Sequence, residues 1–197
     1  MEKQKSYLEI ILGPMFSGKT SALIEIYKQY TFCNIPVLVI NHQEDIRYSN
    51  DASTMVTHDQ KQITCIQSKN IQSVIENNHD NFLQQQYAVL INEGQFFPDL
   101  YESVQTMLNN YNIHIYVAGL DGDFRQEKFG QMLDLIPLCD KVYKLHSLCV
   151  LCKNGTKAIF SHRTVTNCDE QKLVGANDTY IPLCRNCIQS SKKKTDV

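Results

Sequence analysis

A glycine-rich segment near the start of the chain has the residue types and spacing needed to bind phosphate. It reads Gly13-Pro14-Met15-Phe16-Ser17-Gly18-Lys19-Thr20 and fits G-x-x-x-x-G-K-[ST], the Walker A phosphate loop, at every required position. The glycines of such a loop let backbone N–H groups surround phosphate oxygens, and the start of the following helix adds positive potential. Lys19 is expected to reach the β- and γ-phosphates, and the Thr20 hydroxyl is expected to bind Mg²⁺. We therefore predict a nucleoside triphosphate site.

Towards the end of the chain, cysteines occur as two C-x-x-C pairs. The pairs are Cys149 with Cys152 and Cys184 with Cys187. Four thiolates complete a tetrahedral shell and leave no position for a catalytic water, so the pattern predicts structural zinc. Disulfides and redox cysteines are the alternatives, and the doubled spacing favours zinc. The long segment between the pairs is expected to loop out from a clamped base, which would let it close over a ligand.

A carboxylate and several aromatic residues follow an apolar run at 87–91. Glu93 comes just after this predicted strand, which we expect beside the strand that precedes the phosphate loop. A carboxylate there could accept a proton from a substrate hydroxyl, whereas a solvated glutamate at a strand end is the alternative. Nearby phenylalanines favour a flat heterocyclic ligand, although each alone is more often a core residue. These residues are Phe96, Phe97, Phe124 and Phe129.

Alternating strands and helices are the elements that must position these residues. Predicted strands occupy 7–12, 36–40, 63–66, 87–91, 113–118 and 142–145, and predicted helices follow Thr20, span 71–83 with a break near 77–78, start at Asp99 and cover 131–135. Asp99 is expected to cap its helix, with Glu102 in capping-box position. Residues 41–60 are interpreted mostly as loop. We therefore predict an α/β fold with a mostly parallel sheet, helices on both faces, and ligands at the carboxyl ends of the strands.

Composition changes after His146, where strand patterns give way to cysteines and turn residues. This change predicts a nucleotide-binding α/β domain over residues 1–146 and a small zinc-binding domain over 147–197. A net charge of −2 without a clustered basic face argues against nucleic acid as a partner. The sequence has neither a long apolar segment nor a signal-peptide pattern, so we expect no membrane association and a cytoplasmic location.

Together, the motifs resemble the type II thymidine kinases, the cytosolic group shared by bacteria, animals and large DNA viruses. The similar segments run in order from about Leu8 to Cys187 and include the phosphate loop, 93–97, the two C-x-x-C pairs, and Val174-Gly175 with Tyr180. The resemblance implies a P-loop NTPase (RecA-like) fold with a zinc-anchored lasso domain. It also implies γ-phosphoryl transfer from ATP, with Mg²⁺, to the 5′-hydroxyl of thymidine or deoxyuridine, a homotetramer, and feedback inhibition by dTTP.

The resemblance also assigns roles to single residues. Glu93 matches the catalytic base. On the ATP side, positions 13–20 are joined by Asp45, Arg47, Asn92 and Gln95, and Arg47 is expected to stabilise the transferring phosphate. The positions around the thymine ring and in the lasso are Met15, Phe96, Leu120, Phe124, Phe129, Ser161, Gln171, Lys172, Leu173, Val174, Gly175 and Tyr180.

At Asn92 the chain departs from the family pattern, which normally has an aspartate that holds Mg²⁺ before the catalytic glutamate. Asparagine keeps an acceptor oxygen but loses the charge. The alternatives are compensation by the charge of ATP, reduced activity, or an introduced substitution, and intact Lys19, Thr20 and Glu93 favour the first. A deoxynucleoside kinase with relaxed base choice and a nucleotide sensor that has lost catalysis remain the alternative functions.

Overall fold

The computed structural model describes residues 6–44, 54–56, 62–165, 171 and 179–195. Within these residues, the largest sheet has six strands in the order β5-β2-β6-β7-β1-β8, and every neighbouring pair is parallel. The strands are β1 (Tyr7–Leu12), β2 (Val37–His42), β5 (Ile66–Ser68), β6 (Tyr87–Ile91), β7 (Ile113–Gly119) and β8 (Lys141–Lys144). The predicted parallel α/β sheet is confirmed.

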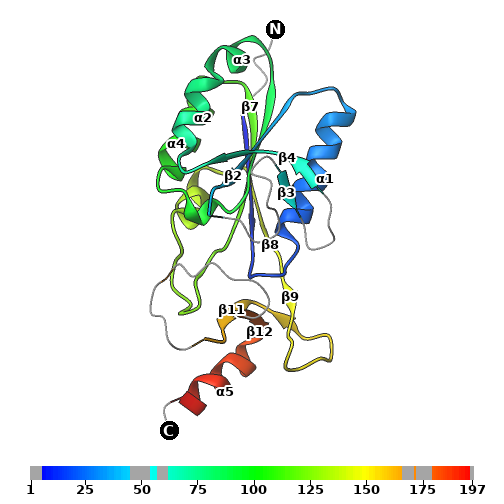
Figure 1. Ribbon diagram of the computed structural model, residues 1–197, viewed down its shortest axis with the longest axis vertical. Coiled ribbons are helices and arrows are strands. Elements are labelled where there is room, and N and C mark those ends of the chain that lie inside the picture. The colour runs from blue at the N-terminus through cyan, green and yellow to red at the C-terminus, as the bar shows by residue number, and fades with distance from the viewer. Residues whose placement is uncertain (1–5, 45–53, 57–61, 166–170, 172–178, 196–197) are drawn as a thin grey trace.

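Helices cover both faces of this sheet, as predicted (Figure 1). One face packs against α1 (Lys19–Phe32). The other packs against α2 (Ile71–Asn77), α3 (His79–Gln84), α4 (Leu100–Asn110) and the 3₁₀ helix η2 (Met132–Leu138). A second 3₁₀ helix, η1 (Gly94–Phe96), follows β6 directly. The break between α2 and α3 falls at Asn78, where the sequence predicted it.

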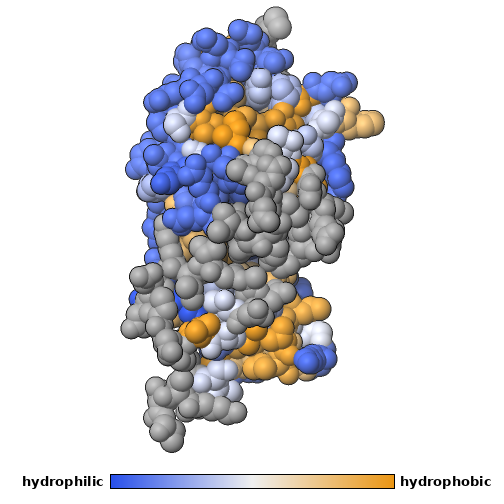
Figure 2. Space-filling model, in the orientation of Figure 1, coloured by the Kyte–Doolittle hydropathy of each residue, from blue (hydrophilic) through white to orange (hydrophobic). Residues whose placement is uncertain are grey.

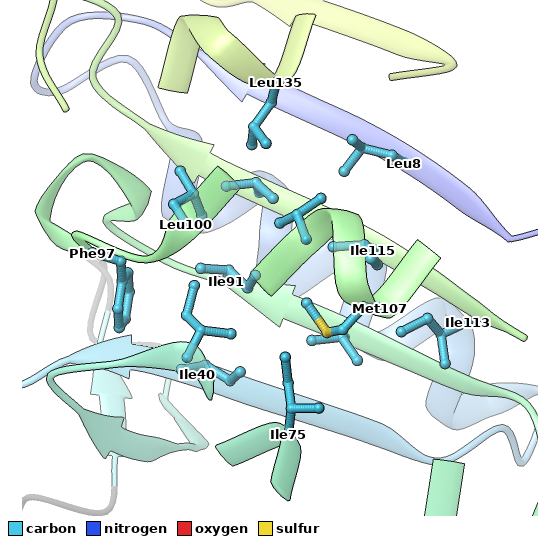
Figure 3. Close-up of a cluster of buried hydrophobic side chains, with 14 of the residues drawn as sticks. Leu8, Ile40, Ile75, Ile91, Phe97, Leu100, Met107, Ile113, Ile115 and Leu135 are labelled. Carbon is cyan, nitrogen blue, oxygen red and sulfur yellow. The ribbon is translucent and has the colours of Figure 1, made fainter. Parts of the chain in front are cut away.

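Successive residues of the central strands point into different cores. Leu8 and Ile10 of β1 lie in the larger cluster, which Figure 3 shows between the sheet and α4, whereas Ile11 lies in the cluster against α1. The same alternation separates Ile91 from Leu90 in β6. A strand buried on both faces needs apolar residues at every position, which is why these segments are continuous apolar runs.

The order of the strands corrects one expectation. The strand that precedes Glu93, β6, does not lie beside β1, because β7 lies between them and pairs with both. Since all three strands are parallel, the loops that follow β1 and β6 still leave the same edge of the sheet. The expected proximity of Glu93 to the phosphate loop therefore depends on this shared edge and not on strand pairing.

Residues 41–60 and the segment after them contain more strand than expected. A small antiparallel hairpin of β3 (Thr54–Val56) and β4 (Gln62–Thr64) lies outside the main sheet (Figure 1). Met55 of this hairpin is 1% exposed and joins the cluster against α1. The single strand predicted at 63–66 is two strands, β4 in the hairpin and β5 in the sheet. Burial of Met55 against α1 is a tertiary contact that the periodicity of the sequence did not indicate.

Asp99 occupies the N-cap position of α4, but its side chain does not cap that helix, so the predicted capping box is wrong. Its backbone, at φ −103° and ψ 17°, is not in the extended region that capping requires. The carboxylate instead accepts hydrogen bonds from the backbone N–H of Gln72, at 2.8 Å, and from the Ser103 hydroxyl, at 3.2 Å. Gln72 lies in the first turn of α2, so Asp99 satisfies the neighbouring helix and ties α2 to α4.

Past His146 the chain forms a small unit with its own apolar cluster (Figure 1). Its elements are β9 (Ser147–Leu148), β10 (Lys157–Ala158), β11 (Phe160–Arg163), β12 (Tyr180–Leu183) and α5 (Arg185–Thr195). β9 pairs with β10 and β11 with β12, both antiparallel. The separate cluster supports a division at His146, which we propose as the domain boundary.

Hydrophobic surface is exposed in two places in this view. In Figure 2 the top of the molecule is hydrophilic, and hydrophobic surface gathers in a band below it and over the C-terminal unit at the bottom. Leu148 and Leu151 of this unit are 64% and 56% exposed. Across the described part of the chain, no helix has both the length and the apolar character that a bilayer span requires.

Candidate active site

The phosphate loop connects β1 to α1 and has the backbone shape that its glycines allow. Gly18 is left-handed, at φ 86°, immediately before α1. A Cβ on Gly13 would lie 2.7 Å from the carbonyl oxygen of Leu145, so no larger residue fits there without a shift. The first turn of α1 carries no acidic residue that would repel an anion. Lys19 is 9% exposed and its ammonium donates to the carbonyl of Pro14 at 2.8 Å.

Oxygen atoms suited to Mg²⁺ meet beside this loop. The Thr20 hydroxyl, in the first turn of α1, lies 3.5 Å from the side-chain oxygen of Asn92, which follows β6. Asn92 is 2% exposed. Mg²⁺ prefers hard oxygen ligands and commonly takes only one or two from the protein, so the hydroxyl and the amide oxygen fit this ion. The two residues that the sequence predicted for the metal are therefore close together.

Glu93 is held in an unusual backbone conformation at the same edge of the sheet. It is left-handed, at φ 53° and ψ 42°, and is 8% exposed. Non-glycine residues adopt this region at a cost and are often found at functional sites. The Gln95 amide donates to the Glu93 carboxylate at 2.5 Å and accepts from the backbone N–H of Leu120 at 2.9 Å. Gln95 therefore orients Glu93. The predicted contact of Gln95 with ATP stays a prediction.

Aromatic rings line the neighbouring surface, but not all of those expected belong to it. Phe96 and Phe129 form an edge-to-face pair with centroids 5.6 Å apart, and His42 lies 5.6 Å from Phe96. Phe97, in contrast, is 1% exposed and is part of the larger core cluster (Figure 3). The expectation that Phe97 faces a ligand is corrected, because its ring is buried in the core, edge-to-face with His42 at 4.8 Å between centroids.

A buried arginine connects the C-terminal unit to this surface. The Arg163 guanidinium lies 3.8 Å from the centroid of the Phe124 ring and donates to the Tyr180 hydroxyl at 2.7 and 3.1 Å. Arg163 is 5% exposed. The sequence predictions missed this residue. Its signal was the spacing from Ser161, because alternate residues of a strand face the same side and both are buried in β11.

Gln171 ties the segment after β11 to the loop that carries Phe124. Its amide donates to the Asp123 carboxylate at 2.9 Å, and its backbone carbonyl accepts from Arg163 at 3.2 Å. Asp123 is 5% exposed and also accepts from the backbone N–H groups of Arg125, at 2.8 Å, and Glu127, at 3.0 Å. The sequence predictions also missed Asp123. An aspartate side chain that accepts a hydrogen bond from the backbone N–H two residues later is typical of a local turn.

The phosphate loop is itself joined to the C-terminal unit. The buried Ser161 hydroxyl, on β11, accepts a hydrogen bond from the backbone N–H of Met15 at 2.9 Å. Of the predicted site, the residues brought to this edge of the sheet are the phosphate loop, Asn92, Glu93, Phe96, Leu120, Phe124, Phe129, Ser161, Gln171 and Tyr180. The residues outside the described part of the chain are Asp45, Arg47, Lys172, Leu173, Val174 and Gly175, and their roles stay predictions.

The four paired cysteines converge at the base of the C-terminal unit. Their sulfur atoms all lie within 4.8 Å of one another, and Cys152 is 3.7 Å from Cys184 and 3.4 Å from Cys187. Four thiolates around zinc, at a Zn–S distance of about 2.3 Å, are separated by about 3.8 Å, so the sulfurs fit a single zinc ion. Cys149 and Cys152 follow β9, and Cys184 and Cys187 lie at the start of α5.

The close thiols also shift one another's pKa values. Burial raises the pKa of the Cys149 thiol, but backbone hydrogen bonds from Cys184, Cys152 and Leu151 outweigh it and lower the pKa to about 6. The neighbouring thiols raise the pKa of Cys187 to about 12. Without a cation, four close sulfurs are expected to hold one thiolate, which accepts hydrogen bonds from the neighbouring thiols.

Comparison with known proteins gives one consistent result. A sequence model of the family described as "Thymidine kinase" matches residues 6–188. The chain is 38% identical to "Thymidine kinase" of Yaba monkey tumor virus over 95% of this chain and 97% of that protein. It is 38% identical to "Thymidine kinase" of Bacteroides thetaiotaomicron over 94% and 88%. It is 35% identical to "Thymidine kinase 1" of Dictyostelium discoideum over 95% and 79%.

Proposed function

The chain belongs to the thymidine kinase family, and from this membership we propose that it transfers the γ-phosphoryl group of ATP to the 5′-hydroxyl of thymidine or deoxyuridine. The strongest structural support is that buried Glu93 and the phosphate loop leave the same edge of one parallel sheet. A base and a phosphate-binding loop that follow two strands of one rigid sheet meet the main need of phosphoryl transfer, which is positioning.

The reaction uses Glu93 and Lys19 in different ways. Glu93 accepts the proton of the nucleoside 5′-hydroxyl. The hydroxyl oxygen forms a bond to the γ-phosphorus, and the bond from that phosphorus to the bridging oxygen of ADP breaks. Lys19, together with backbone N–H groups of the loop, stabilises the charge on the phosphate oxygens. The hydrogen bond from Gln95 holds the Glu93 carboxylate in one orientation. Asp45 and Arg47 are proposed as further contacts on the ATP side.

Thr20 and Asn92 are the residues that would hold Mg²⁺, which supplies charge to neutralise the phosphates when it is bound. Their oxygens would bind the cation directly or accept hydrogen bonds from its water ligands. Asn92 lacks the negative charge of an aspartate, so the phosphate charges of ATP would supply more of the attraction for Mg²⁺ at this site.

The nucleoside side is proposed to lie between the aromatic rings and the C-terminal unit. Phe96 and Phe129 offer the edge-to-face pair against which a flat base packs. Gln171, which bonds to Arg163 and to Asp123 of the opposite loop, supports the proposal that the lasso covers the base and excludes water, so that ATP is not hydrolysed. The remaining proposed contacts are Met15, Leu120, Phe124, Ser161, Lys172, Leu173, Val174, Gly175 and Tyr180.

The four cysteines would hold zinc in a closed shell that takes no part in the reaction. When bound, zinc would link Cys149 and Cys152, after β9, to Cys184 and Cys187, at the start of α5. These two points are the ends of the segment proposed to cover the thymine ring, so the zinc site would fix both ends of that segment. We propose residues 147–197 as this zinc-anchored lasso domain.

We further propose a homotetramer, feedback inhibition by dTTP, a cytoplasmic location, and no role in binding nucleic acid. Exposed Leu148 and Leu151 supply apolar surface for self-association. A net charge of −2 offers no electrostatic attraction to nucleic acid. Light scattering measures the assembly, and inhibition by dTTP is expected to be competitive with thymidine.

A coupled assay of ADP production tests the main proposal. Thymidine and deoxyuridine are expected to stimulate ADP production, and deoxycytidine is not, because its exocyclic amine presents a donor where thymine has an acceptor. In Glu93→Gln, thymidine-dependent turnover is expected to fall by about 10²- to 10⁴-fold while ATP still binds. ATP binding without thymidine-dependent ADP production in the unaltered chain would instead support a nucleotide sensor that has lost catalysis. The names of the matched relatives do not favour this alternative.

A further inference from the structure

Side-chain amides from neighbouring strands form a hydrogen-bonded chain that ends at the phosphate loop. Asn92, after β6, donates from its amide nitrogen to the side-chain oxygen of Asn41, on β2, at 2.9 Å. The amide oxygen of Asn92 faces the Thr20 hydroxyl at 3.5 Å. Asn41 and Asn92 are 1% and 2% exposed. The buried Asn41 side chain therefore holds the nitrogen end of the amide whose oxygen belongs to the pair that suits Mg²⁺.

A third amide gives this chain a direction. In one orientation, both ends of the Gln67 side-chain amide, on β5, have hydrogen-bond partners. The nitrogen then donates to the backbone carbonyls of Asn41, at 3.3 Å, and His42, at 3.0 Å. Its oxygen then accepts from the Asn41 side-chain nitrogen at 3.1 Å. A backbone carbonyl can only accept, so it fixes which end of the Gln67 amide faces it, and each amide then fixes the next. The sequence of contacts runs from Gln67 to Asn41, Asn92 and Thr20.

We propose that Asn41 is a positioning residue that keeps the oxygen of the Asn92 amide, and not its nitrogen, directed at the Mg²⁺ site. The two ends of an amide have nearly the same shape, so the space around Asn92 alone does not select one of them. An oxygen can bind a cation or its water ligands, whereas the NH₂ group, which carries positive partial charge, repels them. An aspartate has two oxygens and needs no such selection. Asparagine at this position works only if a partner orients it.

This inference rests on the proposed function, because it assumes that the site binds Mg²⁺ and ATP. The orientation of the Asn92 amide, however, affects Mg²⁺-dependent binding of the nucleotide and not only the reaction. It can therefore be measured without turnover. The probe is the β,γ-imido analogue of ATP, which is not hydrolysed, and the measured quantity is the gain in its affinity with Mg²⁺ relative to EDTA, by titration calorimetry.

Asn41→Leu removes both hydrogen bonds at nearly constant volume and is expected to reduce this gain about tenfold, in line with the loss of other outer contacts to metal ligands. Affinity in EDTA is expected to stay unchanged. Asn41→Asp still accepts from the Asn92 nitrogen and is expected to retain the gain. Gln67→Met, at a half-buried position, removes a contact to Asn41 without altering Asn92 and is expected to give a smaller loss. This variant covers the case in which Asn41→Leu does not fold.

The decisive comparison adds Asn92→Asp. In this background both terminal atoms are oxygens, so Asn41→Leu is expected to have no effect on the Mg²⁺-dependent gain. A loss of affinity that is equal in Mg²⁺ and EDTA, or an undiminished effect in the Asp background, would overturn the positioning role and leave Asn41 a packing residue. The gain with Mg²⁺ could fall in Asn41→Leu while the unaltered chain fails to phosphorylate thymidine. That result would contradict the proposed function and support the positioning role.

Discussion

The backbone N–H of Met15 donates a 2.9 Å hydrogen bond to the Ser161 hydroxyl, across 146 residues of sequence. Met15 lies in the phosphate loop and Ser161 in β11 of the C-terminal unit, and the bond is buried. The loop proposed to bind ATP and the unit proposed to cover the nucleoside therefore share a direct contact. A buried N–H without a partner is costly, so the loop adopts this shape most readily when β11 is in position.

Ser161→Ala is expected to weaken both sides of the site. Loss of a buried hydrogen bond worth about 1 kcal/mol corresponds to about a fivefold rise in the KM for thymidine, and the KM for ATP is expected to rise as well. Steady-state kinetics with each substrate varied in turn measures both. Ser190→Ala, which removes an exposed hydroxyl bonded within α5, is the control and is expected to change neither. A change in the thymidine KM alone would show that the contact does not couple the two sides.

Replacing Gln95 with leucine tests whether it orients Glu93. Without the 2.5 Å hydrogen bond, the Glu93 carboxylate loses a contact that keeps it directed at the 5′-hydroxyl. Since misplacement by about 1 Å can cost about 100-fold in rate, kcat is expected to fall by this order with little change in the KM for ATP. A rise in the KM for ATP at constant kcat would instead support the predicted contact between Gln95 and ATP.

Arg163→Met removes the cation that lies over the Phe124 ring and the donor to the Tyr180 hydroxyl. A buried cation–π contact is worth up to about 2 kcal/mol, so the KM for thymidine is expected to rise about tenfold. Arg163→Lys is not expected to restore it, because an ammonium lacks the flat surface and the fork of donors. Arg185→Met is the matched control, since Arg185 lies 5.3 Å over the Phe160 ring at an exposed position. Equal effects of the two Met variants would contradict a specific role of Arg163.

Local patterns explain which parts of this site could be predicted. The phosphate loop has a motif with a strand before it and a helix after it, so all the evidence lies within about 25 residues, a length typical of one βα unit. The paired cysteines need only their spacing. The position of β7 between β1 and β6 could not be predicted in the same way, because pairing of parallel strands is decided by packing between distant segments.

Arg163 and Asp123 were missed for a related reason. Each is a single charged residue in a polar segment, where a solvated side chain is the usual outcome. Their burial arises only when Phe124, Tyr180 and Gln171 meet them from elsewhere in the chain. Phe97 shows the opposite error, since its neighbourhood suggested a ligand surface and its side chain turned into the core. Tertiary contacts therefore decide which of several plausible residues reach the site.

The zinc site makes a prediction about stability. Cys187→Ser leaves three thiolates, and the purified variant is expected to lose most of its bound zinc and to unfold at least about 5 °C lower than the unaltered chain. Metal analysis and thermal unfolding measure the two effects. Cys33→Ser changes an exposed cysteine far from the cluster and is expected to alter neither. Retention of one zinc per chain in Cys187→Ser would show that this cysteine is not a ligand.

His114, on β7, is expected to make stability depend on pH. Burial lowers the pKa of its imidazole, partly opposed by Asp140. The Gln86 amide donates to Nε2 at 3.0 Å, so this nitrogen must accept, and Nδ1 lies 2.5 Å from the Tyr30 hydroxyl. A proton added to Nε2 would face the Gln86 NH₂ group. The fold therefore favours the neutral ring.

Because the pKa of folded His114 lies below its unfolded value of about 6.5, the unfolded chain binds the proton more tightly. The stability that the neutral ring contributes is complete above about pH 6.5 and is lost as the pH falls towards the lowered pKa. Urea unfolding from pH 7.5 to pH 5 is expected to show a steeper loss of stability in the unaltered chain than in His114→Gln, which keeps a donor and an acceptor but does not titrate. Parallel pH profiles would show that protons bind elsewhere, since removal of this imidazole is the only ionisable difference between the two chains.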